Sequence, residues 1–196
     1  MENTFVIPYQ LGDKERLFDL GQGIHSSIAL IQKKGGGKVE PFTRSMKKMK
    51  RQALAFGVLT VLQGALMGVG GFSVGKVVLM GLCALLGGCL WATGRTNKLA
   101  FGRAQQLYLQ NNGKGGTITV DDEGFTECNE NGKETRLDWE DYRCCVMCEE
   151  AIVVTFYRPV MLIVSRSEET EDGLLTALGA YGRLDSVYEV EIGGKK

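Results

Sequence analysis

The chain has 196 residues, which suits one or two small domains, and its 23 Lys/Arg balance 23 Asp/Glu. The charge is divided between two halves: residues 1–115 hold 15 basic and 5 acidic residues, and residues 116–196 hold 8 and 18. A basic half that contains an apolar segment favours lipid headgroups as its partner. No basic patch is interleaved with aromatic residues, so we expect no nucleic-acid partner.

Residues 1–43 are expected to form a cytoplasmic segment that packs on a later β-domain. The run Phe5–Tyr9 predicts a short edge strand, because Pro8 has no backbone N–H to donate to a neighbouring strand. The stretch Asp13–Leu20 is compatible with one or two helical turns. Three successive glycines within Lys33–Lys38 predict a turn or a flexible loop.

The longest apolar stretch runs from Gln52 to Gly94, and Lys76 is the one charge among its 43 residues. It predicts membrane spans at residues 53–72 and 77–93, joined by a turn near Ser73–Lys76, within a hairpin domain over residues 44–110. The first span would be about 30 Å long as a helix, which matches the hydrocarbon core of a bilayer. A core helix of a soluble protein would normally show a polar face, and this stretch has none.

Basic residues flank the predicted spans on one side of the membrane only. Lys76 is the one basic residue in the turn, and the flanks carry eight: Arg44, Lys47, Lys48, Lys50, Arg51, Arg95, Lys98 and Arg103. This bias predicts that these eight lie at the membrane surface and that both termini are cytoplasmic. The sequence therefore predicts a multi-pass protein of a cell inner membrane or plasma membrane, with Trp91 at an interface.

Small residues spaced four apart lie in both predicted spans, as Gly64 and Gly68 in the first and Ala84 and Gly88 in the second. Such pairs let helix backbones approach closely in lipid. We favour packing of the hairpin on itself over a dimerisation face, although a homo-oligomer remains an alternative. Gln63 is the one strongly polar residue of the first span, and we expect it to form a hydrogen bond between the helices.

Residues 116–192 predict a cytoplasmic antiparallel β-domain capped by a helix. Six short strands are expected between residues 117 and 164, and a turn at Asn131–Gly132 joins two of them. Acidic residues and a stripe of leucines predict a helix at residues 170–181, and a last strand can follow at residues 186–192. The predicted fold class is α+β, a two-helix transmembrane hairpin with a small curved sheet or barrel.

Residue types that could carry chemistry are present but poorly placed for it. His25 is the one histidine, so a triad or a histidine-rich metal site lacks its usual members, and a surface position is expected. Cys145 and Cys148 are three apart on a predicted strand and should face opposite sides, whereas Tyr142, Cys144 and Cys148 should share a face. We therefore expect reduced thiols, no metal, no cofactor and no enzymatic activity.

Two further patterns are interpreted as turns. Acidic residues gather at Asp121–Glu123 and at Glu140–Asp141, and such clusters are usually solvated. The run Gly35–Lys38 lacks the residues that a phosphate-binding loop requires after its lysine, because Val39 follows.

The layout as a whole resembles the YcxB-like family of bacterial membrane proteins. The matching parts are a short strand ending in Tyr9, a basic stretch, a two-helix hairpin and a β-domain. The best local match is Gly124-Phe125 followed by Arg136–Tyr142, and the strand–turn–strand of Ala151–Ser165 also fits. The resemblance implies a pleckstrin-homology-like C-terminal domain and brings no catalytic residue with it.

Two functions are compatible with these patterns. The first is a non-enzymatic membrane-anchored protein that holds its β-domain at the inner leaflet for binding a protein partner or sensing the envelope. The second is an oligomeric transport or channel accessory subunit, in which Gln63 and the glycines would line a path.

Overall fold

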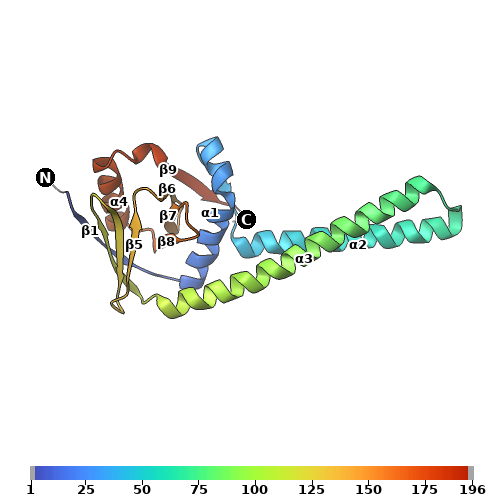
Figure 1. Ribbon diagram of the computed structural model, residues 1–196, viewed down its shortest axis with the longest axis horizontal. Helices are drawn as coiled ribbons and strands as arrows, with labels where there is room; N and C mark the ends of the chain where they lie inside the picture. The colour runs from blue at the N-terminus through green and yellow to red at the C-terminus, as the bar shows by residue number, and fades with distance from the viewer. Residues whose placement is uncertain (1–2, 194–196) are drawn as a thin grey trace. The chain divides into compact units, whose positions relative to one another are not determined.

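The computed structural model describes residues 3–193, and the chain divides into two compact units (Figure 1). The hairpin unit is Thr43–Ala104, and the α+β unit combines Met1–Phe42 with Gln105–Lys196. The long helix that leaves the hairpin ends at Asn111, so its last residues, from Gln105, belong to the α+β unit. The hairpin unit thus stops six residues before the predicted boundary at residue 110.

Residues 3–193 form four helices, one 3-10 turn and nine short strands. In order they are β1 (Phe5–Gln10), α1 (Lys14–Lys34), β2 (Gly37–Val39), α2 (Phe42–Gly70), α3 (Val74–Asn111), β3 (Gly115–Val120), β4 (Gly124–Asn129), β5 (Glu134–Asp138), β6 (Tyr142–Met147), β7 (Ala151–Phe156), β8 (Met161–Ser165), α4 (Glu168–Ala180), the 3-10 turn η1 (Leu184–Ser186) and β9 (Val187–Ile192). The predictions of an α+β chain, of two long apolar helices and of a sheet domain with a final helix are confirmed.

The strands form two sheets in place of the single antiparallel series that we predicted. A four-stranded antiparallel sheet has the order β1-β3-β4-β5, and a five-stranded mixed sheet has the order β2-β9-β6-β7-β8. The chain changes sheet between β5 and β6, at a tight turn in which the backbone N–H of Asp141 donates to the carbonyl of Asp138. Strand β9 follows α4 and lies parallel to both β2 and β6, which short-range patterns do not indicate.

Helix α1 is longer than predicted and continues over 21 residues. Its buried positions Leu17, Leu20, Ile24, Ile28 and Ile31 repeat at helical spacing, so one face packs on β7 and β8. Asp13 caps its start by accepting the backbone N–H of Arg16 at 3.1 Å. Gly35 ends it in the left-handed conformation, with φ of 67°.

An aromatic cluster joins the two sheets of the α+β unit. The Phe125 ring of β4 lies 5.8 Å from the Tyr142 ring of β6 and 5.8 Å from the Phe156 ring of β7. The ring of Trp139, in the turn between the sheets, lies 4.7 Å from that of Phe125. Burial of these rings stabilises the packing of the sheets, beyond what the area alone contributes.

The hairpin unit consists of α2, α3 and the short connection Gly71–Ser73. Gly71 has φ of 76°, which ends α2, and the carbonyl of Ser73 accepts the N–H of Val77 in the first turn of α3. The connection therefore precedes the predicted turn at Ser73–Lys76, and most of that segment belongs to α3.

A seam of small and flexible residues holds the two helices together. The buried positions in α2 are Met46, Ala53 and Met67, and those in α3 are Cys83, Gly87, Gly94 and Phe101. Most of these spacings are seven residues or twice seven, the repeat of helices that coil around each other. A methyl group built on Gly87 would lie 3.2 Å from Cβ of Phe56, which marks the closest approach of the seam.

Candidate functional site

Between its two basic ends, the surface of the hairpin unit outside this seam is apolar. Large side chains such as Val61, Leu66, Val69 and Leu85 are 64% to 92% exposed. Helices α2 and α3 are both long and apolar enough to cross a membrane, and at most 17% of their most apolar stretch is buried. A helix from the core of a soluble protein would be mostly buried, so this surface is the most unusual feature of the molecule.

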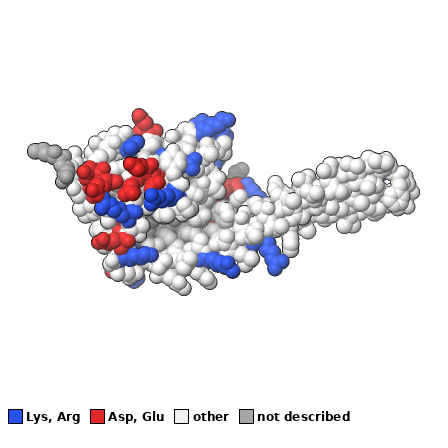
Figure 2. All heavy atoms as spheres, in the orientation of Figure 1, with Lys and Arg blue, Asp and Glu red and all other residues white. Residues whose placement is uncertain are grey.

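The two units differ in the charged residues that they contain. The hairpin unit contains nine Lys/Arg and no Asp/Glu, and the rest of the chain contains the other 14 basic residues and all 23 acidic ones. Figure 2 shows the same division, since the hairpin arm is almost entirely white while red and blue spheres crowd the other unit. No carboxylate of the hairpin unit is therefore present to pair with its lysines and arginines.

The eight basic residues predicted to flank the spans are all exposed. Five precede Gln52 in α2 and three follow Gly94 in α3, and the antiparallel packing brings these segments to the same end of the hairpin. The Met49 sulfur lies 3.6 Å from a methyl group built on Gly94, which fixes this alignment. Lys76 lies at the other end, where a methyl group on Gly70 would be 3.7 Å from its Nζ.

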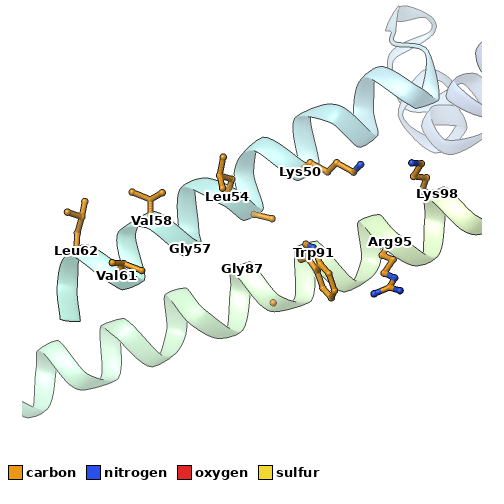
Figure 3. A pocket seen from close by; sticks show the side chains of 12 residues that line it. Lys50, Leu54, Gly57, Val58, Val61, Leu62, Gly87, Trp91, Arg95 and Lys98 are labelled. Carbon is orange, nitrogen blue, oxygen red and sulfur yellow. The ribbon is translucent and has the colours of Figure 1, made fainter. Parts of the chain in front are cut away.

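A groove of about 1080 Å³ runs along the hairpin between α2 and α3 (Figure 3). This volume is slightly above the usual range for small-molecule sites, about 300–1,000 Å³. Its lining is apolar along most of its length and basic at one end: Lys50, Ala53, Leu54, Gly57, Val58, Val61, Leu62, Gly87, Gly88, Trp91, Arg95 and Lys98. Figure 3 shows Lys50, Arg95 and Lys98 at one end and Leu62 toward the other.

Trp91 and Arg95 form a pair at the basic end of the groove. The guanidinium carbon of Arg95 lies 5.6 Å from the centre of the Trp91 ring, within the range of a cation–π interaction. Tryptophan is enriched where hydrocarbon meets headgroups, because its ring is apolar and its N–H is polar. The pair thus occupies the transition between the apolar and the basic parts of the groove.

The predicted small-residue motifs contribute little to packing within the hairpin. Gly64 makes ordinary contact with Met80, at 3.8 Å from a built methyl group to the sulfur. A methyl group on Gly68 or Gly88 would have no neighbour within 4 Å, and Ala84 is exposed. The close approach instead uses Gly87, because the residues that face the partner helix are set by the seven-residue repeat and not by the four-residue motif.

Gln63 lies toward the seam, yet it does not form the predicted hydrogen bond through its carbonyl oxygen. Its Oε1 atom is buried and has no hydrogen-bond partner among residues 3–193. Burying an amide oxygen without a hydrogen-bond partner is costly in free energy.

The cysteines of the α+β unit are packed as core residues. Cys144, Cys145 and Cys148 are buried and free of disulfides. Burial raises the pKa of each of these thiols, which keeps them protonated and poorly nucleophilic. Within residues 3–193 no group of three His, Cys, Asp or Glu is arranged to hold a metal ion.

One prediction about the faces of β6 is wrong. Tyr142 pairs with Phe156 and Cys144 pairs with Thr155, so a bulge lies between them. Because Phe156 and Thr155 are adjacent on β7 and face opposite sides, Tyr142 and Cys144 also face opposite sides. The bulge places the Tyr142 ring in the aromatic cluster, where its hydroxyl lies 2.9 Å from that of Ser186.

The acidic clusters serve as turns and ion pairs. The Asp121 carboxylate accepts the backbone N–H groups of Glu123 and Gly124, at 2.9 and 3.0 Å. Asp141 pairs with Arg158 at 2.7 Å. His25 is half-buried, where a surface position was predicted, and its Nδ1 atom has no hydrogen-bond partner in the described part of the chain.

A buried polar cluster in the α+β unit has no counterpart among the sequence predictions. The Tyr9 hydroxyl donates to Oε1 of Glu127 at 2.6 Å, and burial raises the pKa of both groups. Burial also raises the pKa of Tyr108, whose hydroxyl has no partner within residues 3–193. These residues come from β1, β4 and the end of α3, so the cluster depends on tertiary contacts that no local motif marks.

Comparisons with protein-family models, with curated proteins and with solved structures find no match to this chain. The resemblance to the YcxB-like family, and the pleckstrin-homology-like fold that it implies, therefore stay predictions that rest on the residues named above.

Proposed function

We propose that this protein is a non-enzymatic membrane protein whose hairpin crosses the bilayer twice and holds the α+β unit at the cytoplasmic face. There the α+β unit, a pleckstrin-homology-like domain by the resemblance, binds a protein partner or senses the state of the envelope. The observation that carries the proposal is the exposed apolar surface of α2 and α3, in a unit without a single acidic residue.

The dimensions of the hairpin support a transmembrane arrangement. The uncharged part of α2, Gln52–Gly70, has 19 residues, and that of α3, Val77–Gly94, has 18. At 1.5 Å per residue they are about 28 and 27 Å long, close to the roughly 30 Å hydrocarbon core. Eight basic residues at one end and Lys76 at the other favour a cytoplasmic location for both termini.

Charge reversal tests the orientation. Replacing Arg44, Lys47, Lys48, Lys50 and Arg51 with Glu should invert or scramble the topology that reporter fusions at both termini record, because the bias that retains this end is lost. The matched control exchanges Arg and Lys at the same five positions, which preserves the charge and should preserve the topology. Unchanged reporter positions in the Glu variant, or release of the wild-type protein from membranes by alkaline carbonate, would refute the proposal.

A second candidate is an oligomeric transport or channel accessory subunit. It is favoured by the open small-residue positions Gly68 and Gly88, which leave room for the close approach of another helix. Two helices cannot enclose a pore, so this function requires several copies. Native mass measurement in detergent should then show an oligomer that Gly68→Leu with Gly88→Leu disperses, and a wild-type monomer would exclude it.

A further inference from the structure

The basic end of the groove carries positive charge that the protein does not neutralise. Lys50, Arg95 and Lys98 are all exposed, and no ion pair involves any of them within residues 3–193. The hairpin unit contains no carboxylate that a rearranged side chain could reach. Three cations from two helices line one end of the groove, and phosphate is the group that Arg and Lys bind best.

The remaining length of the groove is suited to hydrocarbon. Next to the cations its wall consists of the exposed side chains Leu54, Val58, Val61 and Leu62, and its floor includes glycines at positions 57, 87 and 88, which carry no side chain. From Lys50 to Leu62 the helix advances by about 18 Å. That is close to the thickness of one leaflet, since half of the hydrocarbon core is roughly 15 Å.

The geometry points to an anionic phospholipid of the bilayer as the occupant of this groove. Its phosphate is held by Lys50, Arg95 and Lys98, and one of its acyl chains lies along the apolar wall between α2 and α3. This inference rests on the proposed membrane location of the hairpin. It adds a specific lipid site to what would otherwise be a general attraction of basic residues to an anionic surface.

The charges favour a lipid over a second copy of the chain. In a symmetric dimer along this groove, the three cations of one copy would approach the same three cations of the other, with no acidic residue of the hairpin unit to separate them. A partner helix would also extend past Leu62 across the second leaflet, whereas the groove ends there. A single lipid satisfies both the charge and the length.

Trp91 provides a probe inside the groove. The chain has two tryptophans, and the other, Trp139, belongs to the α+β unit. The protein is reconstituted in phosphatidylcholine vesicles with either brominated phosphatidylglycerol or brominated phosphatidylcholine at the same mole fraction, and quenching of Trp91 emission is measured. The variant Trp91→Phe supplies the background from Trp139. We expect the anionic lipid to associate with the groove about tenfold more strongly than the zwitterionic lipid.

Two matched triple variants separate the site from general surface attraction. Lys50→Gln, Arg95→Gln and Lys98→Gln remove the groove cations and should bring the two lipids to near parity. Lys47→Gln, Lys48→Gln and Arg103→Gln remove the same number of Lys and Arg from the same helices outside the groove and should leave most of the preference. Both variants keep five of the eight flanking charges, so the membrane orientation should be the same.

The outcomes separate the lipid site from the proposed function. Strong quenching by both lipids without a preference, or an equal loss in both triple variants, overturns the lipid site and leaves the membrane location standing. Absence of quenching by either lipid, together with a monomer in native mass measurement, overturns both. Absence of quenching together with a stable dimer shows that a second copy fills the groove, which also overturns the lipid site.

Discussion

The two units of this chain differ in whether their apolar residues are buried or exposed. In the α+β unit, all six residues of β7 are buried, and β6 is buried on both faces apart from Arg143. In the hairpin unit, α2 and α3 together bury seven residues and expose most of their leucines and valines. This difference is what the proposed membrane location of the hairpin predicts, because apolar burial drives folding only where water is the alternative.

Charged residues follow the same division. The α+β unit pairs many of its charges, as in the contact of Arg166 with Glu171 at 2.7 Å and of Arg16 with Glu150 at 3.0 Å. The hairpin unit has basic residues alone and confines eight of the nine to one end. An exposed ion pair contributes little to stability in water, whereas a charge in hydrocarbon is costly. The distribution of charged residues therefore agrees with water around the α+β unit and with the proposed lipid around the middle of the hairpin.

The largest expected effects come from placing the same charge in both units. Val154→Asp puts a carboxylate at a fully buried position and should cost more than about 4 kcal/mol of unfolding free energy, measured by urea titration in detergent. Leu85→Asp, at a position 64% exposed, should change that free energy by less than about 0.5 kcal/mol. It should instead reduce membrane insertion, with an apparent cost of about 3 kcal/mol.

The comparison fails if these two variants behave alike. Were Leu85→Asp to improve solubility in plain buffer while the protein remained folded and monomeric, water would be the natural solvent of the hairpin. Leu85→Ala is the control for side-chain size, and it should be inserted nearly as well as the wild type.

A smaller effect is expected from the seam of the hairpin. Gly87→Val introduces atoms where even a methyl group meets Phe56 at 3.2 Å, so the helices must separate at a cost of about 1–3 kcal/mol. Gly81→Val is the matched control in the same helix, because nothing lies within 4 Å of its added methyl group. Thermal loss of the helical circular dichroism signal in micelles measures both. Equal midpoints for the two variants would show that Gly87 is not at a close contact.

The smallest effect concerns pH in the α+β unit. Burial raises the pKa of the Glu127 carboxyl above its value in the unfolded chain. The proton is therefore held more tightly in the folded state, and stability is lost as the pH rises through the folded pKa. Glu127→Gln retains an acceptor for the Tyr9 hydroxyl and removes this loss, so its stability relative to the wild type should increase from acidic to neutral pH. Urea titrations at several pH values measure this difference, and a constant difference would contradict the assignment.

Local sequence patterns were sufficient to predict those elements whose surroundings stay the same from one end of the element to the other. The two apolar helices, the strands β3 to β8 and the final helix follow from hydropathy, alternation and turn residues between them. The position of β1 at the edge of its sheet agrees with the missing donor of Pro8. Helix α1 continues beyond Leu20, where the predicted turns ended, and contains Gly21 and Gly23. They are tolerated there because each faces a close neighbour, Ile163 and the carbonyl of Glu40, respectively.

The sequence predicted the basic residues of the candidate site but not which of them line the groove. The eight basic residues are recognisable because charge beside an apolar run is rare and informative. Which of them line the groove depends on the rotation of α2 against α3, and that rotation is set by the seam. Nearly every residue of the spans is apolar, so hydropathy does not distinguish the residues of the seam. The glycine motifs with four-residue spacing do not include Gly87, so they did not predict it either.

The sequence by itself determined the kind of surface that each region presents, because hydropathy and charge belong to residues and need no partner to be recognised. Tertiary structure alone decided the division of the strands into two sheets, the parallel return of β9, and the lining of one groove by Lys50, Arg95 and Lys98. These features depend on contacts between residues that are far apart in the chain. The energy of such contacts comes from the packing of many side chains together, so no single segment of the sequence encodes it.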